Sequence, residues 1–220
     1  MRFSTLKGAA VAALVAALAS GCATPQPYDY TAFKQSRPKS VLILPPQNSS
    51  PEVKATYSML SQMTHPLAES GYYVLPVTLV DETFKQNGLN NPGEIHTVAP
   101  AKLRDIFGAD AALYVDVKEY GSTYTILSSE VTVAADAKLV DLQSGSLLWQ
   151  GSAVASSAEN QNNSGGGLVG MLVVAVIKQI TNSLTEQSHS YAGITSQRLL
   201  TAGRPNGMLY GPSSPHYGKD

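Results

Sequence analysis

The fold is decided by the stretch Ser40-Val41-Leu42-Ile43-Leu44-Pro45-Pro46, a continuous apolar run that ends at two prolines. An uninterrupted apolar run of this length is typical of a β-strand that is buried on both faces. Such strands occur mainly in sheets that helices cover on both sides. The stretch therefore predicts a buried strand at the start of a domain that mixes helices and strands.

A helix and a second strand follow this run. Residues 52–70 carry apolar side chains at spacings of three and four, the pattern of an amphipathic helix. These side chains are Val53, Tyr57, Leu60, Met63 and Leu67. Gly71 stands at the C-cap position, and Pro66 is expected to kink or shorten the last turn. With a second strand at residues 72–77, the segment predicts a right-handed βαβ crossover with parallel strands.

The next predicted elements are two short helices and three strands. The helices cover residues 79–88 and 100–107, and a glycine closes each of them. Residues 111–120, 130–139 and 146–154 alternate apolar and polar side chains, which predicts an antiparallel meander with one polar face. The polar face of its first strand is expected to carry Tyr114, Asp116, Lys118 and Tyr120. The fold class is therefore α/β, or α+β, with a mixed sheet and helices packed on it.

Two C-terminal helices are predicted after a polar, glycine-rich loop at residues 158–167. The first, at residues 168–184, has an apolar stripe, but its uncharged part is too short to span a bilayer. It is either a core helix or a helix that lies against another subunit or the bilayer surface. For the second case, the candidate interaction residues are Leu168, Leu172 and Val176. The second helix covers residues 187–202.

The two ends of the chain differ in composition from the single domain at residues 40–203. Residues 22–39 contain three prolines and no apolar period, so we expect a tether. Residues 204–220 are dense in proline and glycine, which predicts an extended tail. The tail is either disordered or docks on this chain or a neighbour through tyrosines, with Tyr210 and Tyr217 as candidate interaction residues.

The N-terminus has the form of a secretory signal peptide at residues 1–21. Arg2 and Lys7 are followed by an uncharged run, which is too short for a transmembrane helix. Leu18-Ala19-Ser20-Gly21-Cys22 resembles a bacterial lipobox, which implies cleavage after Gly21 and attachment of acyl chains, such as palmitate, to Cys22. Ala23, rather than Asp, implies delivery to the outer membrane, with the protein facing the periplasm. Two or three acyl chains anchor a protein stably to a membrane.

No pattern in the sequence predicts an enzyme, a cofactor or a metal site. The 15 Lys and Arg balance 16 Asp and Glu, which argues against a nucleic-acid partner, and one cysteine excludes Cys-based zinc sites. The histidines are far apart, and no nucleophile elbow, phosphate loop or zinc-protease motif is present. Asp105, Asp110 and Asp116 are interpreted as solvated edge positions. We expect no catalytic residues.

Four short motifs carry a resemblance to a known family. They are Leu44-Pro45-Pro46-Gln47-Asn48, Gly108-Ala109-Asp110-Ala111, the hairpin from Asp141 to Trp149, and Leu209-Tyr210-Gly211-Pro212. In these motifs the chain resembles a family of bacterial outer-membrane lipoproteins of unknown function, of the neisserial genome-derived antigen type. The resemblance implies a fold similar to the N-terminal domain of TolB, CsgG and PelC.

The resemblance also implies a role in the envelope. We expect a structural or assembly component of an envelope or export complex, anchored in the membrane through Cys22. Its expected partners are other envelope proteins or further copies of this chain. The alternative is a periplasmic binding or chaperone-like lipoprotein.

Overall fold

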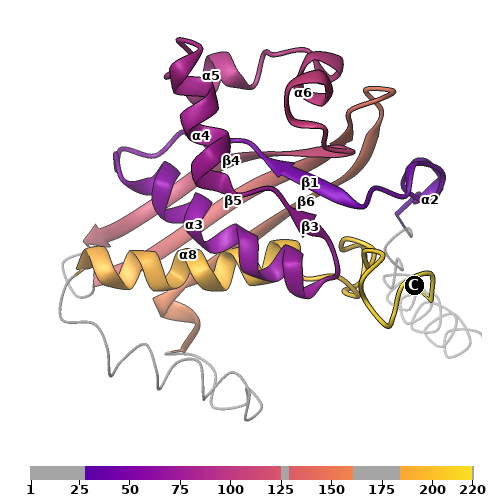
Figure 1. Ribbon diagram of the computed structural model, residues 1–220. Coiled ribbons are helices and arrows are strands. Elements are labelled where there is room, and N and C mark those ends of the chain that lie inside the picture. Colours follow the sequence, from indigo (N-terminus) through magenta and orange to yellow (C-terminus); the bar gives the residue numbers. More distant parts are fainter. Residues whose placement is uncertain (1–27, 125–128, 161–183, 220) are drawn as a thin grey trace, which may run out of the picture.

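The structure is a computed structural model that describes residues 28–124, 129–160 and 184–219 (Figure 1). Within these residues, a six-stranded mixed sheet has the order β3-β1-β4-β5-β6, and β2 pairs with β4. The strands are β1 (Ser40–Ile43), β2 (Gln47–Asn48), β3 (Tyr73–Val74), β4 (Ala111–Tyr124), β5 (Ser129–Asp141) and β6 (Leu147–Ser156). The α-helices are α2 (Thr31–Ser36), α3 (Ala55–Glu69), α4 (Val77–Gln86), α5 (Pro92–Ile95), α6 (Pro100–Phe107) and α8 (Leu184–Leu200), and Ser157–Asn160 form a short 3₁₀ helix.

The sheet confirms the predicted fold class. β1 runs parallel to β3 and β4, and α3 connects β1 to β3, so the βαβ crossover is present. β4, β5 and β6 form the predicted antiparallel meander. Val41, Leu42 and Ile43 are fully buried, as a strand covered on both faces requires. β3 is shorter than predicted because α4 already begins at Val77.

Helices cover the two faces of the sheet unequally. α3 and α8 lie along one face, where Met63, Leu113 and Trp149 belong to a single buried cluster (Figure 1). α4, α5 and α6 lie on the opposite face, over β1 and the first part of β4, where Leu42 and Phe84 belong to a second cluster. The second cluster contains no residue of β6. The outer face of the meander is therefore left partly open by the described helices.

The buried stripe of α3 differs from the predicted one. Val53 and Tyr57 are 86% and 51% exposed, whereas Leu60, Met63 and Leu67 are buried as expected. The helix begins only at Ala55, so Val53 lies outside it, and the buried stripe passes through Met59 instead of Tyr57. Pro66 lies inside the helix, which nevertheless continues to Glu69.

The predicted polar face of β4 is wrong at Tyr120. The pairing with β5 shifts between Val117 and Glu119, which marks a β-bulge. One additional residue in a strand reverses the side to which all later side chains point. Tyr120 therefore lies in the core, 6% exposed, and its hydroxyl is 2.6 Å from Ser58 Oγ on α3.

Both ends of the described chain pack on the domain. The tether predicted to reach residue 39 is shorter, because Thr31–Ser36 form α2 and Phe33 is buried. In the tail, the backbone oxygen of Asn206 accepts a hydrogen bond from Trp149 Nε1 at 3.0 Å, and that of Leu209 accepts one from the Tyr72 hydroxyl at 2.6 Å. Aromatic side chains of the domain therefore bind the tail backbone. Among the described helices, none has the length and apolar character needed to cross a bilayer.

Candidate functional site

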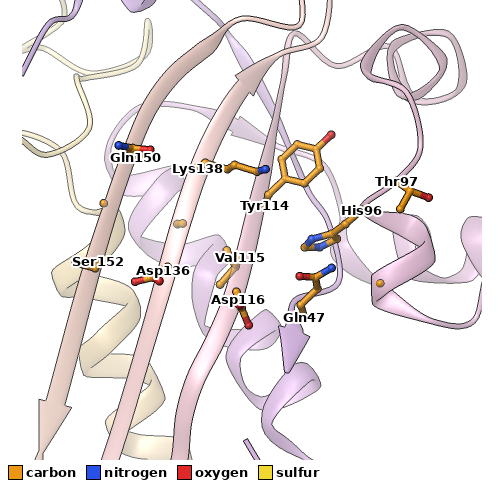
Figure 2. Close-up of a pocket in the computed structure, with 13 residues that line it drawn as sticks. Gln47, His96, Thr97, Tyr114, Val115, Asp116, Asp136, Lys138, Gln150 and Ser152 are labelled. Carbon is orange, nitrogen blue, oxygen red and sulfur yellow. The ribbon is translucent and has the colours of Figure 1, made fainter. Parts of the chain in front are cut away.

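An open groove of about 700 Å³ lies on the outer face of the meander, beside α5 (Figure 2). Alternation along the strands brings polar side chains of β4, β5 and β6 to this face. We call it the sheet groove and define it by Gln47, His96, Tyr114, Asp116, Asp136, Lys138, Gln150 and Ser152. Tyr114, Asp116, Asp136 and Lys138 follow from the predicted alternation. Gln47 lies on β2, which was not predicted, and His96 comes from the connection after α5, which no strand pattern could place.

His96 forms one wall of the sheet groove. Its Nε2 lies 2.9 Å from the carbonyl oxygen of Pro45, so Nε2 is the nitrogen that carries the proton. The ring meets the Tyr114 ring edge to face, with 5.3 Å between the centroids. Partial burial lowers the pKa of His96, and the nearby charge of Lys138 adds to this effect. At neutral pH the imidazole is therefore uncharged, and its role in the groove is structural.

The charged side chains of the sheet groove are held by neighbours. The Nζ of Lys138 lies 5.1 Å from the centre of the Tyr114 ring, a cation–π contact. Asp116 accepts a hydrogen bond from Ser49 Oγ at 2.9 Å and pairs with Lys118, whose Nζ is also 3.8 Å from Asp136. The groove thus presents a fixed pattern of both charges beside an aromatic ring.

The folded protein is expected to lose stability as the pH falls from about 7 to 5, in part through His96. Because its pKa is lower in the folded state than in the unfolded chain, the unfolded chain binds more protons as the pH falls below about 6.5. The stability that this lowered pKa contributes is therefore complete above that pH, and it is lost as the pH falls through the pKa of folded His96. Urea unfolding of wild type and His96→Gln across this range should show a shallower pH dependence for the variant. Parallel curves would contradict the assignment.

Outside the groove, the fold brings together a serine and a histidine that are far apart in sequence. Ser58 Oγ on α3 is 2.7 Å from Nδ1 of His189 on α8, and the other ring nitrogen is 2.7 Å from Nε2 of Gln62. The contacts are exposed and Ser58 Oγ is also bonded to Tyr120. A nucleophile additionally needs donors for the oxyanion, and none is placed by these contacts. We interpret the group as a polar link between the two helices.

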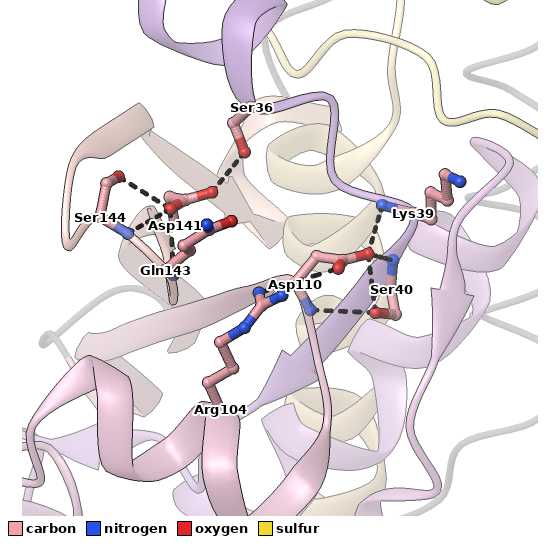
Figure 3. Close-up of polar contacts among 8 residues, drawn as sticks. All are labelled: Ser36, Lys39, Ser40, Arg104, Asp110, Asp141, Gln143 and Ser144. Atoms are coloured by element: carbon pink, nitrogen blue, oxygen red, sulfur yellow. Dashed lines mark hydrogen bonds and ion pairs between the residues drawn. The ribbon is translucent and has the colours of Figure 1, made fainter.

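Two carboxylates of the sequence motifs have structural roles (Figure 3). Asp110 is not a solvated edge position, because its Oδ2 accepts hydrogen bonds from the backbone of Lys39 and from both the backbone and hydroxyl of Ser40. Asp116 lies in the open sheet groove, where its carboxylate remains partly exposed. Asp110 thus fixes the start of β1 to the start of β4.

Asp141 fixes the β5–β6 turn and the end of α2 (Figure 3). Its Oδ1 accepts from the backbone nitrogens of Gln143 and Ser144, and its Oδ2 accepts from the Ser36 hydroxyl. Burial alone would raise the pKa of Asp141, but these hydrogen bonds together lower it. The carboxylate therefore stabilises the fold at neutral pH, and this contribution is lost in acid.

The residues predicted from the sequence as a site do not meet in the sheet groove. Tyr210 and Tyr217 line a separate cavity of about 260 Å³ between α2 and the tail, together with Lys34 and Arg37. The remaining predicted residues lie outside the described residues; they are Cys22, Leu168, Leu172 and Val176. Among the described residues, no three His, Cys, Asp or Glu side chains gather in a metal-binding arrangement.

Comparison with known proteins shows which family of proteins the chain resembles. The model of the family described as "Putative lipoprotein GNA1162-like" matches residues 28–213. A lipoprotein of Neisseria meningitidis serogroup B, NMB1124/NMB1162, is 51% identical over 185 residues, which are 84% of this chain and 85% of that protein. The crystal structure of lipoprotein GNA1162 from Neisseria meningitidis is 53% identical and has a TM-score of 0.55, over 66% of this chain and all of that chain.

A more distant solved structure is the PelC dodecamer from Paraburkholderia phytofirmans. It is 15% identical, with a TM-score of 0.42 over 73% of this chain and 86% of that chain. A likeness at this distance carries no functional argument. The family model and the neisserial relative, by contrast, each cover most of the chain. The chain belongs to the GNA1162-like lipoprotein family.

Proposed function

We propose that the protein is a structural or assembly component of the bacterial outer membrane, anchored through acyl chains on Cys22 and facing the periplasm. In this role it docks other envelope proteins, or further copies of itself, on the sheet groove. The proposal gives the chain no catalytic step. It rests mainly on one observation, the open polar face that α4, α5 and α6 leave on the meander.

The form of the sheet groove supports binding of a protein surface. Lys138, Asp116 and Asp136 present both charges on a sheet, where the backbone keeps them in fixed positions. Such charge patterns give specificity and fast association between proteins. The lipobox at Cys22 and the membership of a lipoprotein family support the anchor. An envelope scaffold needs both a surface that binds partner proteins and a membrane anchor.

Crosslinking in intact cells tests the proposal. A photoreactive amino acid placed at Gln150 or Ser152 is expected to yield defined adducts with an envelope protein or a second copy of the chain. The same amino acid at the exposed Lys54, which lies outside the groove, is the matched control. Adducts of equal yield at all three positions, or adducts at Lys54 alone, would contradict docking on the groove.

A change of charge provides a second test of the same surface. Lys138→Glu reverses the charge beside Tyr114 and places three carboxylates together in the groove, so the crosslinks at Ser152 are expected to fall at least about tenfold. The melting temperature checks that the variant is folded, and Lys54→Glu is the matched control. If Lys138→Glu keeps full crosslinking while folded, the groove is not the docking surface.

The alternative function is binding of a small periplasmic ligand in the same groove. The groove volume of about 700 Å³ is within the range of ligand sites, although these are mostly apolar and enclosed. Crosslinking distinguishes the two functions, because a small ligand gives no protein adduct at Gln150 or Ser152.

A further inference from the structure

The end of the molecule that carries α2 and the tail differs in charge from the rest. Residues 28–39 and 204–220 contain five basic side chains and two acidic ones, Asp29 and Asp220. The basic residues are Lys34, Arg37, Lys39, Arg204 and Lys219. In the described residues between 40 and 203, by contrast, acidic side chains outnumber basic ones. The positive charge is therefore concentrated in two terminal segments of the described chain.

These two segments lie side by side (Figure 1). The backbone nitrogen of Tyr28 donates to Asn206 Oδ1 at 3.1 Å, and the Tyr30 hydroxyl donates to the backbone oxygen of Gly207. Lys34 and Arg37 line one cavity with Tyr210 and Tyr217. We call this surface the basic end and define it by Lys34, Arg37, Arg204, Lys219, Tyr210 and Tyr217. Its four basic side chains are exposed.

The basic end is also the part of the described chain nearest to Cys22. Five residues lie between Cys22 and Tyr28, so the α-carbons of these two residues are at most about 22 Å apart. Because Tyr28 contacts Asn206, the tail lies about as close to Cys22 as Tyr28 and the start of α2 do. The 14 residues of β4 extend about 45 Å from their start near Lys39, so the far end of the sheet is beyond this reach.

We infer that the basic end is a membrane-contact surface that binds the anionic phospholipid headgroups of the leaflet holding the anchor. The inference rests on the proposed acylation of Cys22. Guanidinium and ammonium groups bind phosphate, and tyrosines are enriched at the membrane interface. The attraction acts over a Debye length, about 8 Å at physiological salt, and a tether this short keeps the cations close enough to the leaflet to come within that range.

Vesicle binding without the lipid anchor tests this surface directly. The probe is the chain from residue 22 onward with Cys22→Ser, which keeps every described residue. It is expected to cosediment with vesicles of phosphatidylglycerol and phosphatidylethanolamine in equal parts, but not with phosphatidylcholine vesicles. Each cation near an anionic surface strengthens binding about fivefold. The triple variant Arg37→Gln, Arg204→Gln, Lys219→Gln is therefore expected to bind about 100-fold more weakly.

A matched triple variant controls for net charge. Lys54→Gln, Lys85→Gln and Lys102→Gln remove the same charge from exposed positions outside the basic end, so binding is expected to change less than about threefold. Arg37→Lys with Arg204→Lys keeps the charge and is expected to keep the binding. Equal loss in both Gln triples, or equal binding to phosphatidylcholine, would overturn the inference. The melting temperature of each variant confirms that it is folded.

Acylation of Cys22 is measured separately, by labelling of the full-length chain in cells with an azido fatty acid. Absence of the label from wild type would contradict the proposed anchor, while the vesicle result of the unlipidated chain would stand by itself. Loss of selectivity for anionic vesicles, with the label present, would contradict the membrane-contact surface alone. The two failures are therefore distinguishable.

Discussion

Removal of residues 204–220 is expected to lower the free energy of unfolding by on the order of 5 kcal/mol. The truncation exposes the core around Met208 and Leu209, which are 1% and 9% exposed. It also removes the backbone oxygens that accept hydrogen bonds from Trp149 Nε1 and the Tyr72 hydroxyl. Since domains are stable by about 5–15 kcal/mol, this loss is a large part of the total.

Trp149 reports the change directly, because it is the single tryptophan of the chain and is 1% exposed. In the truncated chain its fluorescence is expected to shift to longer wavelength, and the urea midpoint is expected to fall. The control is a shorter truncation of residues 216–220, whose described members are exposed. We expect it to change the free energy of unfolding by less than about 1 kcal/mol. If the two truncated chains have the same free energy of unfolding, residues 204–215 of the tail do not stabilise the domain.

Gly71→Ala is expected to cost about 3–5 kcal/mol of stability. Gly71 has φ +97°, a conformation that L side chains rarely adopt, and it lies directly under the tail. A Cβ there would come within 2.5 Å of the Ser214 nitrogen and 2.8 Å of the Gly211 oxygen. Either the backbone of Gly71 must change or the tail must move, and urea unfolding measures the cost.

Gly88→Ala is the matched control for this variant. Gly88 has φ +80°, but a Cβ there would have no neighbour within 4 Å, so only the backbone strain of about 1–2 kcal/mol is expected. In the chain truncated at residue 204, the contact with Ser214 and Gly211 is gone, and the two variants should cost the same. A Gly71→Ala cost that is unchanged by the truncation would show that the tail contact is not its cause.

Much of the fold could be predicted because it depends on local patterns. The apolar run at residues 40–44 is β1 in the structure, and the glycines that close α4 and α6 follow where helices were expected to end. The alternation at residues 130–139 is correct throughout β5, whose Val131, Val133 and Leu139 are buried. Helix and strand periods are properties of neighbouring residues, so a single sequence reveals them.

The sheet groove could be predicted only in part. The strand alternation identifies Asp116, Asp136 and Lys138 as polar-face residues, but it gives no sign of which part of that face the helices leave open. His96 reaches the groove through the position of α5 and its contact with Pro45. Ser58 and His189 likewise meet through the packing of α3 on α8, two helices that are far apart in sequence.

The sequence by itself determined the fold class, the family, and the lipobox that predicts an anchor at Cys22, since each depends on the order of nearby residues. The tertiary structure alone decided which way Tyr120 points. The bulge moves all later side chains of β4 to the other face of the sheet, and no apolar pattern in the sequence marks its position. It also decided that α2 and the tail pack on the domain. The tail is held by hydrogen bonds to its backbone oxygens and by close approaches of glycines, and both segments bury isolated apolar side chains such as Phe33 and Met208. Neither kind of contact leaves a periodic pattern in a sequence.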